Sequence, residues 1–70
     1  MFWKPRSKFG RFLDERGINQ RWLAKQTNIT EGTISDLANG KRQPTLQTAN
    51  KIVKELRKFD SKISAEDFWG

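Results

Sequence analysis

The feature that most constrains the fold is a series of helix-end signals at short intervals. Residues that favour chain reversal or a helix N-cap occur at 17–19, 28–30 and 39–45, and Pro44 stands directly before Thr45. Glycine and asparagine tolerate the left-handed conformation that ends a helix, and asparagine and threonine cap the next one. These signals divide the 70 residues into short segments, each too short to fold alone.

Apolar residues within the segments recur at helical spacing. Phe9, Phe12 and Leu13 follow the i, i+3, i+4 pattern of a helix face. The inner positions predicted for the next three helices are Leu23, Ala24 and Thr27; Ile34 and Leu37; and Leu46, Ala49, Ile52, Val53 and Leu56. Ser64 and Asp67 have the spacing of a capping box before a short last helix, "AEDFW". No window alternates with period two, so we predict an all-α fold of five helices.

The charge of the chain points to an anionic partner. Fourteen Lys and Arg residues face eight Asp and Glu residues, which gives a net charge of +6. The chain has no histidine and no cysteine, so we expect no disulfide, no Cys/His zinc site, no thiol or imidazole catalysis and no cofactor. No long apolar run suggests a signal peptide or a membrane span. We therefore expect a non-enzymatic cytoplasmic protein that associates with the nucleoid.

The helix-end signals between residues 19 and 40 have the spacing of a helix-turn-helix. Two short helices flank the three-residue turn Asn28–Thr30, and the small residue Ala24 stands where the helices must approach each other. In this motif the first helix crosses the DNA backbone and the second enters the major groove. Helix pairs of this kind also occur in proteins that do not bind DNA.

The sequence also resembles the lambda-repressor-like helix-turn-helix domains of phage repressors and Cro proteins. The resemblance rests on Asn19-Gln20, Leu23-Ala24, Thr33-Ile34-Ser35, Leu37, Asn39-Gly40-Lys41-Arg42, and Pro44 followed by Leu46. It implies one domain over residues 1–70, a compact five-helix bundle with a basic N-terminal arm at about 1–7. The helix-turn-helix lies at about 19–40 and the C-terminal helix at about 64–69. It further implies a repressor of the phage or mobile-element type that binds double-stranded DNA at a palindromic operator.

The resemblance assigns site residues by their position in the motif. The base-reading positions are Glu31, Gly32, Thr33, Ser35 and Asp36. The phosphate contacts fall on Asn19, Gln20, Asn39, Lys41, Arg42 and Thr45. Arg21 and Lys25 are spaced i, i+4 on the same predicted helix as Gln20, and they either flank the DNA backbone or form a solvated face. Amides, cations and helix N-termini suit phosphate oxygens. No metal ligand and no catalytic residue is expected.

Two acids among the reading positions, Glu31 and Asp36, allow two interpretations. In the first, a carboxylate accepts a hydrogen bond from the N4 amino group of cytosine and rejects guanine. In the second, Glu31 merely complements the helix dipole and Asp36 is a solvated surface acid. The residues alone leave both interpretations open.

Other features of the sequence also leave alternatives open. The arm, with Phe2 and Trp3, either reaches DNA or covers the core. Trp22 either completes the edge of the core or contacts a partner. Phe59, Phe68 and Trp69 either cover the monomer core or form the interface of a weak homodimer on DNA. Leu13 and Ala38 stand where relatives often have an Arg–Glu pair, and the segment before the last helix is about five residues longer than in relatives.

The alternative function is a helix-turn-helix domain that has become a protein-interaction module. Such an antirepressor or adaptor would use its acidic third helix to bind a regulatory protein. The dependence of binding on salt separates the two functions, because DNA binding weakens steeply as salt rises.

Overall fold

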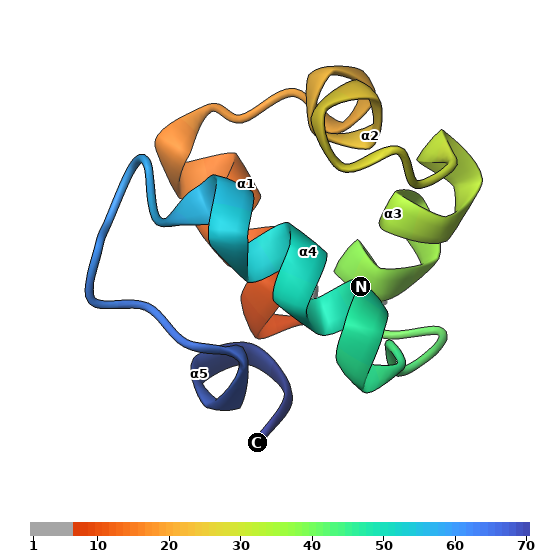
Figure 1. The fold of residues 1–70 in the computed structure, drawn as a ribbon. Coiled ribbons are helices and arrows are strands. Elements are labelled where there is room, and N and C mark those ends of the chain that lie inside the picture. The colour runs from red at the N-terminus through yellow and green to blue at the C-terminus, as the bar shows by residue number, and fades with distance from the viewer. Residues whose placement is uncertain (1–6) are drawn as a thin grey trace, which may run out of the picture.

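The computed structural model describes residues 7–70, which form five helices and no strand. The helices are α1 (Lys8–Arg16), α2 (Gln20–Thr27), α3 (Glu31–Ala38), α4 (Leu46–Leu56) and α5 (Ala65–Trp69). In Figure 1, α2 and α3 form an angled pair; α3 packs against α1, α2 packs against α4, and α5 packs against α1 and α4 at one end of the molecule. The predicted all-α five-helix fold is confirmed.

The helices begin and end where the cap residues predict. Asn19, Thr30 and Thr45 cap α2, α3 and α4, and each side chain accepts hydrogen bonds from backbone N–H groups of the first turn. Gly17 ends α1 with φ 65°. Ser64 and Asp67 form the capping box of α5, in which the Ser64 amide donates to Asp67 Oδ2 over 2.8 Å.

The core lies where the first four helices meet. Its largest fully buried side chains are Phe9, Leu13, Leu23, Ile34, Leu37, Ile52 and Leu56. Leu13 and Ala38 are both buried in this core, so apolar packing occupies the place where relatives often have an ion pair. A well-packed apolar pair there is at least as stable as a buried ion pair.

One predicted core position is wrong. Leu46 was expected on the inner stripe of α4, but it is 77% exposed. Leu46 is the first residue of α4, and the buried residues of that helix begin one turn later, at Ala49. The Leu46 side chain therefore lies at the surface rather than in the core.

Aromatic residues near the C-terminus pack onto α1. The Phe68 ring lies 5.9 Å from that of Phe9 and 5.4 Å from that of Phe12, and the Trp69 ring lies 5.3 Å from that of Phe9. The two contacts of Phe68 are edge-on and that of Trp69 is tilted, and aromatic contacts at these distances add to the stabilisation from burial. Phe68 and Trp69 therefore cover the core within one copy of the chain.

Trp22 packs against the segment that follows α4. Its ring meets Phe59 edge-on at 5.8 Å, and both residues remain partly exposed. Trp22 therefore makes its aromatic contact within the monomer, with a residue of the segment between α4 and α5. Of the basic arm, Ser7 caps α1 and donates to the Leu37 and Ala38 carbonyls, and the predictions for Phe2 and Trp3 lie outside the described residues.

Candidate DNA-binding surface

The turn between α2 and α3 has the geometry of a helix-turn-helix. Asn28 ends α2 in the left-handed conformation, with φ 60°, and Thr30 begins α3 as its N-cap. The Asn28 and Ile29 amides donate to the Ala24 carbonyl, which closes the turn. Ala24 is buried at this point, so a larger side chain there would push the two helices apart.

One face of α3 is directed inward and the other outward. Ile34, Leu37 and Ala38 are buried. All five predicted base-reading positions keep solvent-accessible surface; Glu31 and Gly32 are the most exposed, and Thr33, Ser35 and Asp36 are half-buried. The structure thus brings these positions together on one outward surface of a single helix.

Gly32 gives this surface a flat section. A Cβ atom built at Gly32 has no neighbour within 4 Å, so the missing side chain leaves open space rather than relieving a clash. Glycine lowers the stability of a helix, and at this position it relieves no steric clash within the monomer. The bare backbone at this point lets another molecule approach α3 closely.

Two hydroxyl groups on α3 are held by local hydrogen bonds. The Thr33 hydroxyl oxygen accepts from the Thr30 hydroxyl over 2.8 Å, and the Ser35 hydroxyl oxygen accepts from Asn39 Nδ2 over 3.4 Å. In both contacts the residue on α3 serves as the acceptor. Each hydroxyl therefore keeps its own proton to donate to a ligand.

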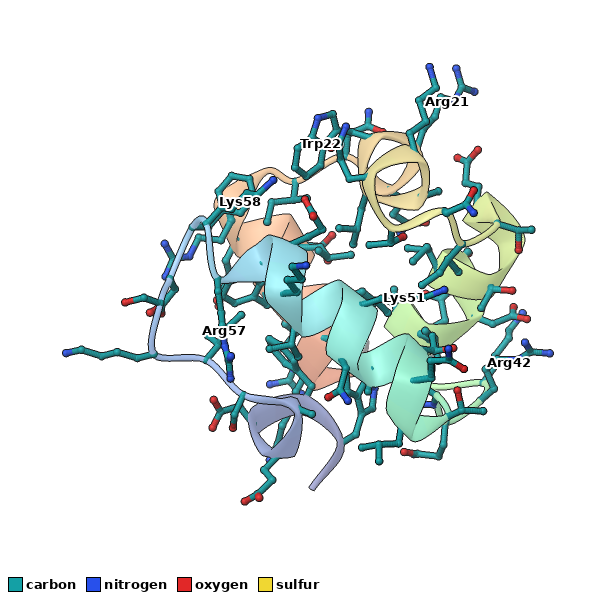
Figure 2. The ribbon with its side chains drawn as sticks, viewed as in Figure 1. Arg21, Trp22, Arg42, Lys51, Arg57 and Lys58 are labelled. Carbon is teal, nitrogen blue, oxygen red and sulfur yellow. The ribbon has the colours of Figure 1, made fainter. Side chains whose placement is uncertain are left out.

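Cations from two other segments flank α3. Arg21 and Lys25 lie on α2, and Lys41 and Arg42 lie in the segment that follows α3; all four are exposed. Figure 2 shows Arg21 and Arg42 on the side of the molecule where α3 lies, one on each side of that helix. Lys58 lies on the opposite side of this view.

The predicted polar phosphate contacts lie at helix ends. Asn19 Oδ1 accepts from the Arg21 and Trp22 amides over 2.7 and 3.1 Å, so the amide nitrogen of this side chain is the group left for a ligand. Thr45 Oγ1 accepts from the Thr48 amide over 3.2 Å. Gln20 and Asn39 are half-buried beside them. Asn19 and Thr45 thus lie at the N-termini of α2 and α4, and the N-terminus of a helix favours an anion.

Sequence reasoning missed the contacts between these charged groups. Arg21 Nε lies 3.7 Å from Glu31 Oε1, and Arg42 Nε lies 3.9 Å from Asp36 Oδ2. The outward face of α3, which carries Glu31, Gly32, Thr33, Ser35 and Asp36, is called the reading surface. Each acid on this reading surface is thus paired with an arginine that was predicted to contact a phosphate. The partners of each pair are ten and six residues apart and lie on different elements. Helical periodicity therefore does not predict the pairs, which depend on how α2 and the segment after α3 are placed against α3.

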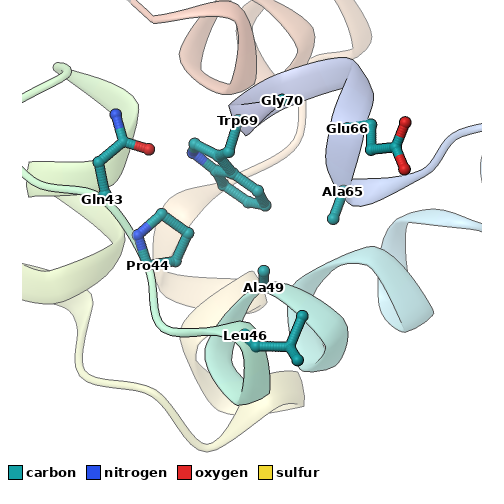
Figure 3. Close-up of a pocket in the computed structure, with 8 residues that line it drawn as sticks. All are labelled: Gln43, Pro44, Leu46, Ala49, Ala65, Glu66, Trp69 and Gly70. Atoms are coloured by element: carbon teal, nitrogen blue, oxygen red, sulfur yellow. The ribbon is translucent and has the colours of Figure 1, made fainter.

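Sequence reasoning also missed a groove between the N-terminal end of α4 and α5. The groove encloses about 290 Å³ and is lined mainly by Pro44, Leu46, Ala49, Ala65 and Trp69 (Figure 3). Glu66 is the one charged residue among those that line it. The exposed Leu46 stands at its edge, so this surface is apolar and nearly uncharged within a basic chain.

Features of two other classes of site are absent from the described part of the chain. Within residues 7–70, no helix has the length and hydrophobicity to cross a membrane. The same residues contain no group of three or more side chains that could hold a metal ion.

Comparison with known proteins agrees with the geometry of the turn. A family model described as helix-turn-helix matches residues 11–67, which is most of the chain. Neither curated proteins nor solved structures give a match. The matched family is one of regulatory DNA-binding domains. The chain belongs to the Cro/C1-type helix-turn-helix family of DNA-binding regulators.

Proposed function

We propose that this protein is a transcriptional repressor that binds a palindromic operator through the major groove. The observation that carries the proposal is the placement of exposed cations on both sides of the outward face of α3. A helix whose polar face lies between two basic edges fits a groove whose walls are phosphates. Repression follows from occupancy, because a protein bound in the groove excludes polymerase from the same DNA.

In the proposed complex, α3 enters the groove with Glu31, Gly32, Thr33, Ser35 and Asp36 toward the bases. One phosphate strand contacts α2 through Asn19, Gln20, Arg21 and Lys25, and the other contacts Asn39, Lys41, Arg42 and Thr45. The Thr33 and Ser35 hydroxyls are placed to donate to base acceptors, and the carboxylates to accept from cytosine. The phosphate contacts fix the register and the α3 side chains select the sequence.

We further propose that a second copy of the chain occupies the groove beside Leu46. Leu46 and the groove adjoin on one molecule, so a two-fold axis near Leu46 places each leucine in the partner's groove. The low charge supports this occupant, because two chains of net charge +6 repel each other at their other, basic surfaces. The small size of the groove, about 290 Å³, predicts a weak dimer that forms on DNA, with half-sites about 34 Å apart.

Selection of bound sequences from random duplexes, at two salt concentrations, tests the main proposal. We expect an enriched palindrome whose affinity falls as salt rises. If no sequence is enriched even at low salt, the operator proposal is wrong. The remaining candidate is then a protein-interaction module that uses the acidic face of α3.

Substitution at Leu46 tests the pairing separately. We expect Leu46→Gln to bind a single half-site as the wild type does, but to lose cooperative binding to the full palindrome. Leu46→Met, which keeps an apolar side chain of similar volume, serves as the matched control and should retain cooperativity. Equal cooperativity in the wild type and Leu46→Gln would show that the copies meet elsewhere.

A further inference from the structure

The two ion pairs of the reading surface share one arrangement. In each, a carboxylate on α3 meets an arginine from a neighbouring segment, Glu31 with Arg21 of α2 and Asp36 with Arg42 after α3. The two acids are five residues apart, which is about 7.5 Å along the helix axis. The two pairs therefore hold both flanking arginines against the helix that lies between them.

Both pairs are open to exchange with a ligand. The exposed fractions are 75% and 53% for the Arg21 and Glu31 side chains, and 56% and 42% for Arg42 and Asp36. Contacts of 3.7 and 3.9 Å are close enough for attraction but too long for strong hydrogen bonds. An arriving phosphate can thus take either arginine without disturbing the fold.

We propose that Glu31 and Asp36 compete with DNA phosphates for Arg21 and Arg42, and that contact with a cytosine amino group ends this competition. The inference rests on the proposed function and assigns the two acids a role that neither earlier interpretation gave them. They act on the arginines as well as on the bases.

The chemistry couples base contact to phosphate contact. At a matching site, the N4 amino group of cytosine donates to the carboxylate, and the arginine is released to a phosphate. At other sites the carboxylate meets no donor from the bases and keeps its arginine. Nonspecific complexes therefore use fewer cations than the specific complex does.

The expected size follows from the exposure of the pairs. An exposed ion pair changes an equilibrium by about 1.4- to 5-fold, so two pairs lower nonspecific affinity by about two- to thirtyfold. Each released arginine adds about 0.9 to the slope of log K against log salt. The specific complex should then have a slope steeper by about 1.8 than the nonspecific complex.

A double-mutant cycle on a duplex of random sequence tests the competition. Binding is measured against salt for the wild type, Arg21→Gln, Glu31→Gln and the double variant, with the same set for Arg42→Gln and Asp36→Asn. We expect Arg21→Gln to lower the affinity for the random duplex only slightly in the wild type. In the Glu31→Gln background the same substitution should lower that affinity by up to about fivefold more. Melting curves verify that each variant is folded.

Glu15→Gln is the matched control, because it removes one negative charge from an exposed position on α1 rather than from the outward face of α3. Its effect should add to that of Arg21→Gln without coupling. The inference is overturned if Glu31→Gln and Arg21→Gln are also additive, or if specific and nonspecific salt slopes are equal. These outcomes presuppose DNA binding; a wild type that binds no duplex at all refutes the proposed function itself.

Discussion

Replacement of Gly32 by alanine should raise the stability of the protein while weakening its binding to DNA. Gly32 is in the first turn of α3, and an added Cβ has no neighbour within 4 Å, so the monomer accommodates the methyl group without strain. Alanine stabilises a helix interior by about 0.5–1 kcal/mol relative to glycine. In the first turn of a helix we expect a difference at the lower end of that range. We therefore expect a gain of about 0.5 kcal/mol in the free energy of unfolding.

This gain should appear as a higher melting temperature. For a domain of this size, 1 kcal/mol shifts Tm by about 4–8 °C, so Gly32→Ala should melt about 2–4 °C above the wild type. Thermal unfolding followed by circular dichroism at 222 nm measures the shift. A lower Tm would mean that the position is not helical or that the methyl group meets a neighbour.

The effect on DNA should have the opposite sign. If the backbone at Gly32 lies against the base edges, the added methyl group has to displace the groove wall, at a cost of about 1–3 kcal/mol. That range corresponds to about a 5- to 150-fold loss of affinity for the selected site. Fluorescence anisotropy with a labelled duplex measures it.

Asn50→Ala on the exposed side of α4 is the matched control. It also gains helix propensity, by up to about 0.7 kcal/mol, at a position outside the predicted DNA contacts. It should raise Tm and leave affinity unchanged. Unchanged or tighter DNA binding by Gly32→Ala would refute the close approach of α3 to the bases at this residue.

Three further substitutions test the packing of the fold. Phe9→Ala removes a fully buried ring that touches Phe68 and Trp69. It should lower the free energy of unfolding, measured by urea denaturation, by about 3–5 kcal/mol. A decrease of less than about 1 kcal/mol would contradict the central place of Phe9 in the core. Gly17→Ala forces a side chain into a φ of 65° and should cost about 1–2 kcal/mol, seen as a lower Tm, whereas an unchanged Tm would mean that α1 ends differently. Arg57→Gln removes the hydrogen bond from Nε to the Ile63 carbonyl, 3.0 Å long, and should speed amide exchange in α5 before it changes global stability; unchanged exchange would show that the contact does not hold the segment.

The sequence alone determined the helices and their ends. Asn19, Thr30 and Thr45 act within four residues of themselves, so their cap hydrogen bonds depend on local geometry and not on the rest of the fold. Helical periodicity likewise predicted the inner residues of α2 and α3, because the period depends only on neighbouring residues of the same helix. The turn between these helices was predicted because its asparagine and its threonine each require a particular backbone conformation.

Only the tertiary structure decided which side chains meet across helices. The pairing of Arg21 with Glu31 depends on the angle between α2 and α3, and that of Trp22 with Phe59 depends on the path of the chain after α4. The exposure of Leu46 depends on where neighbouring helices end, which no periodicity along α4 records. Local hydrogen bonds fix where a helix begins and ends, whereas the relative placement of helices comes from packing the whole core, and that placement determines the charged and apolar surfaces of this protein.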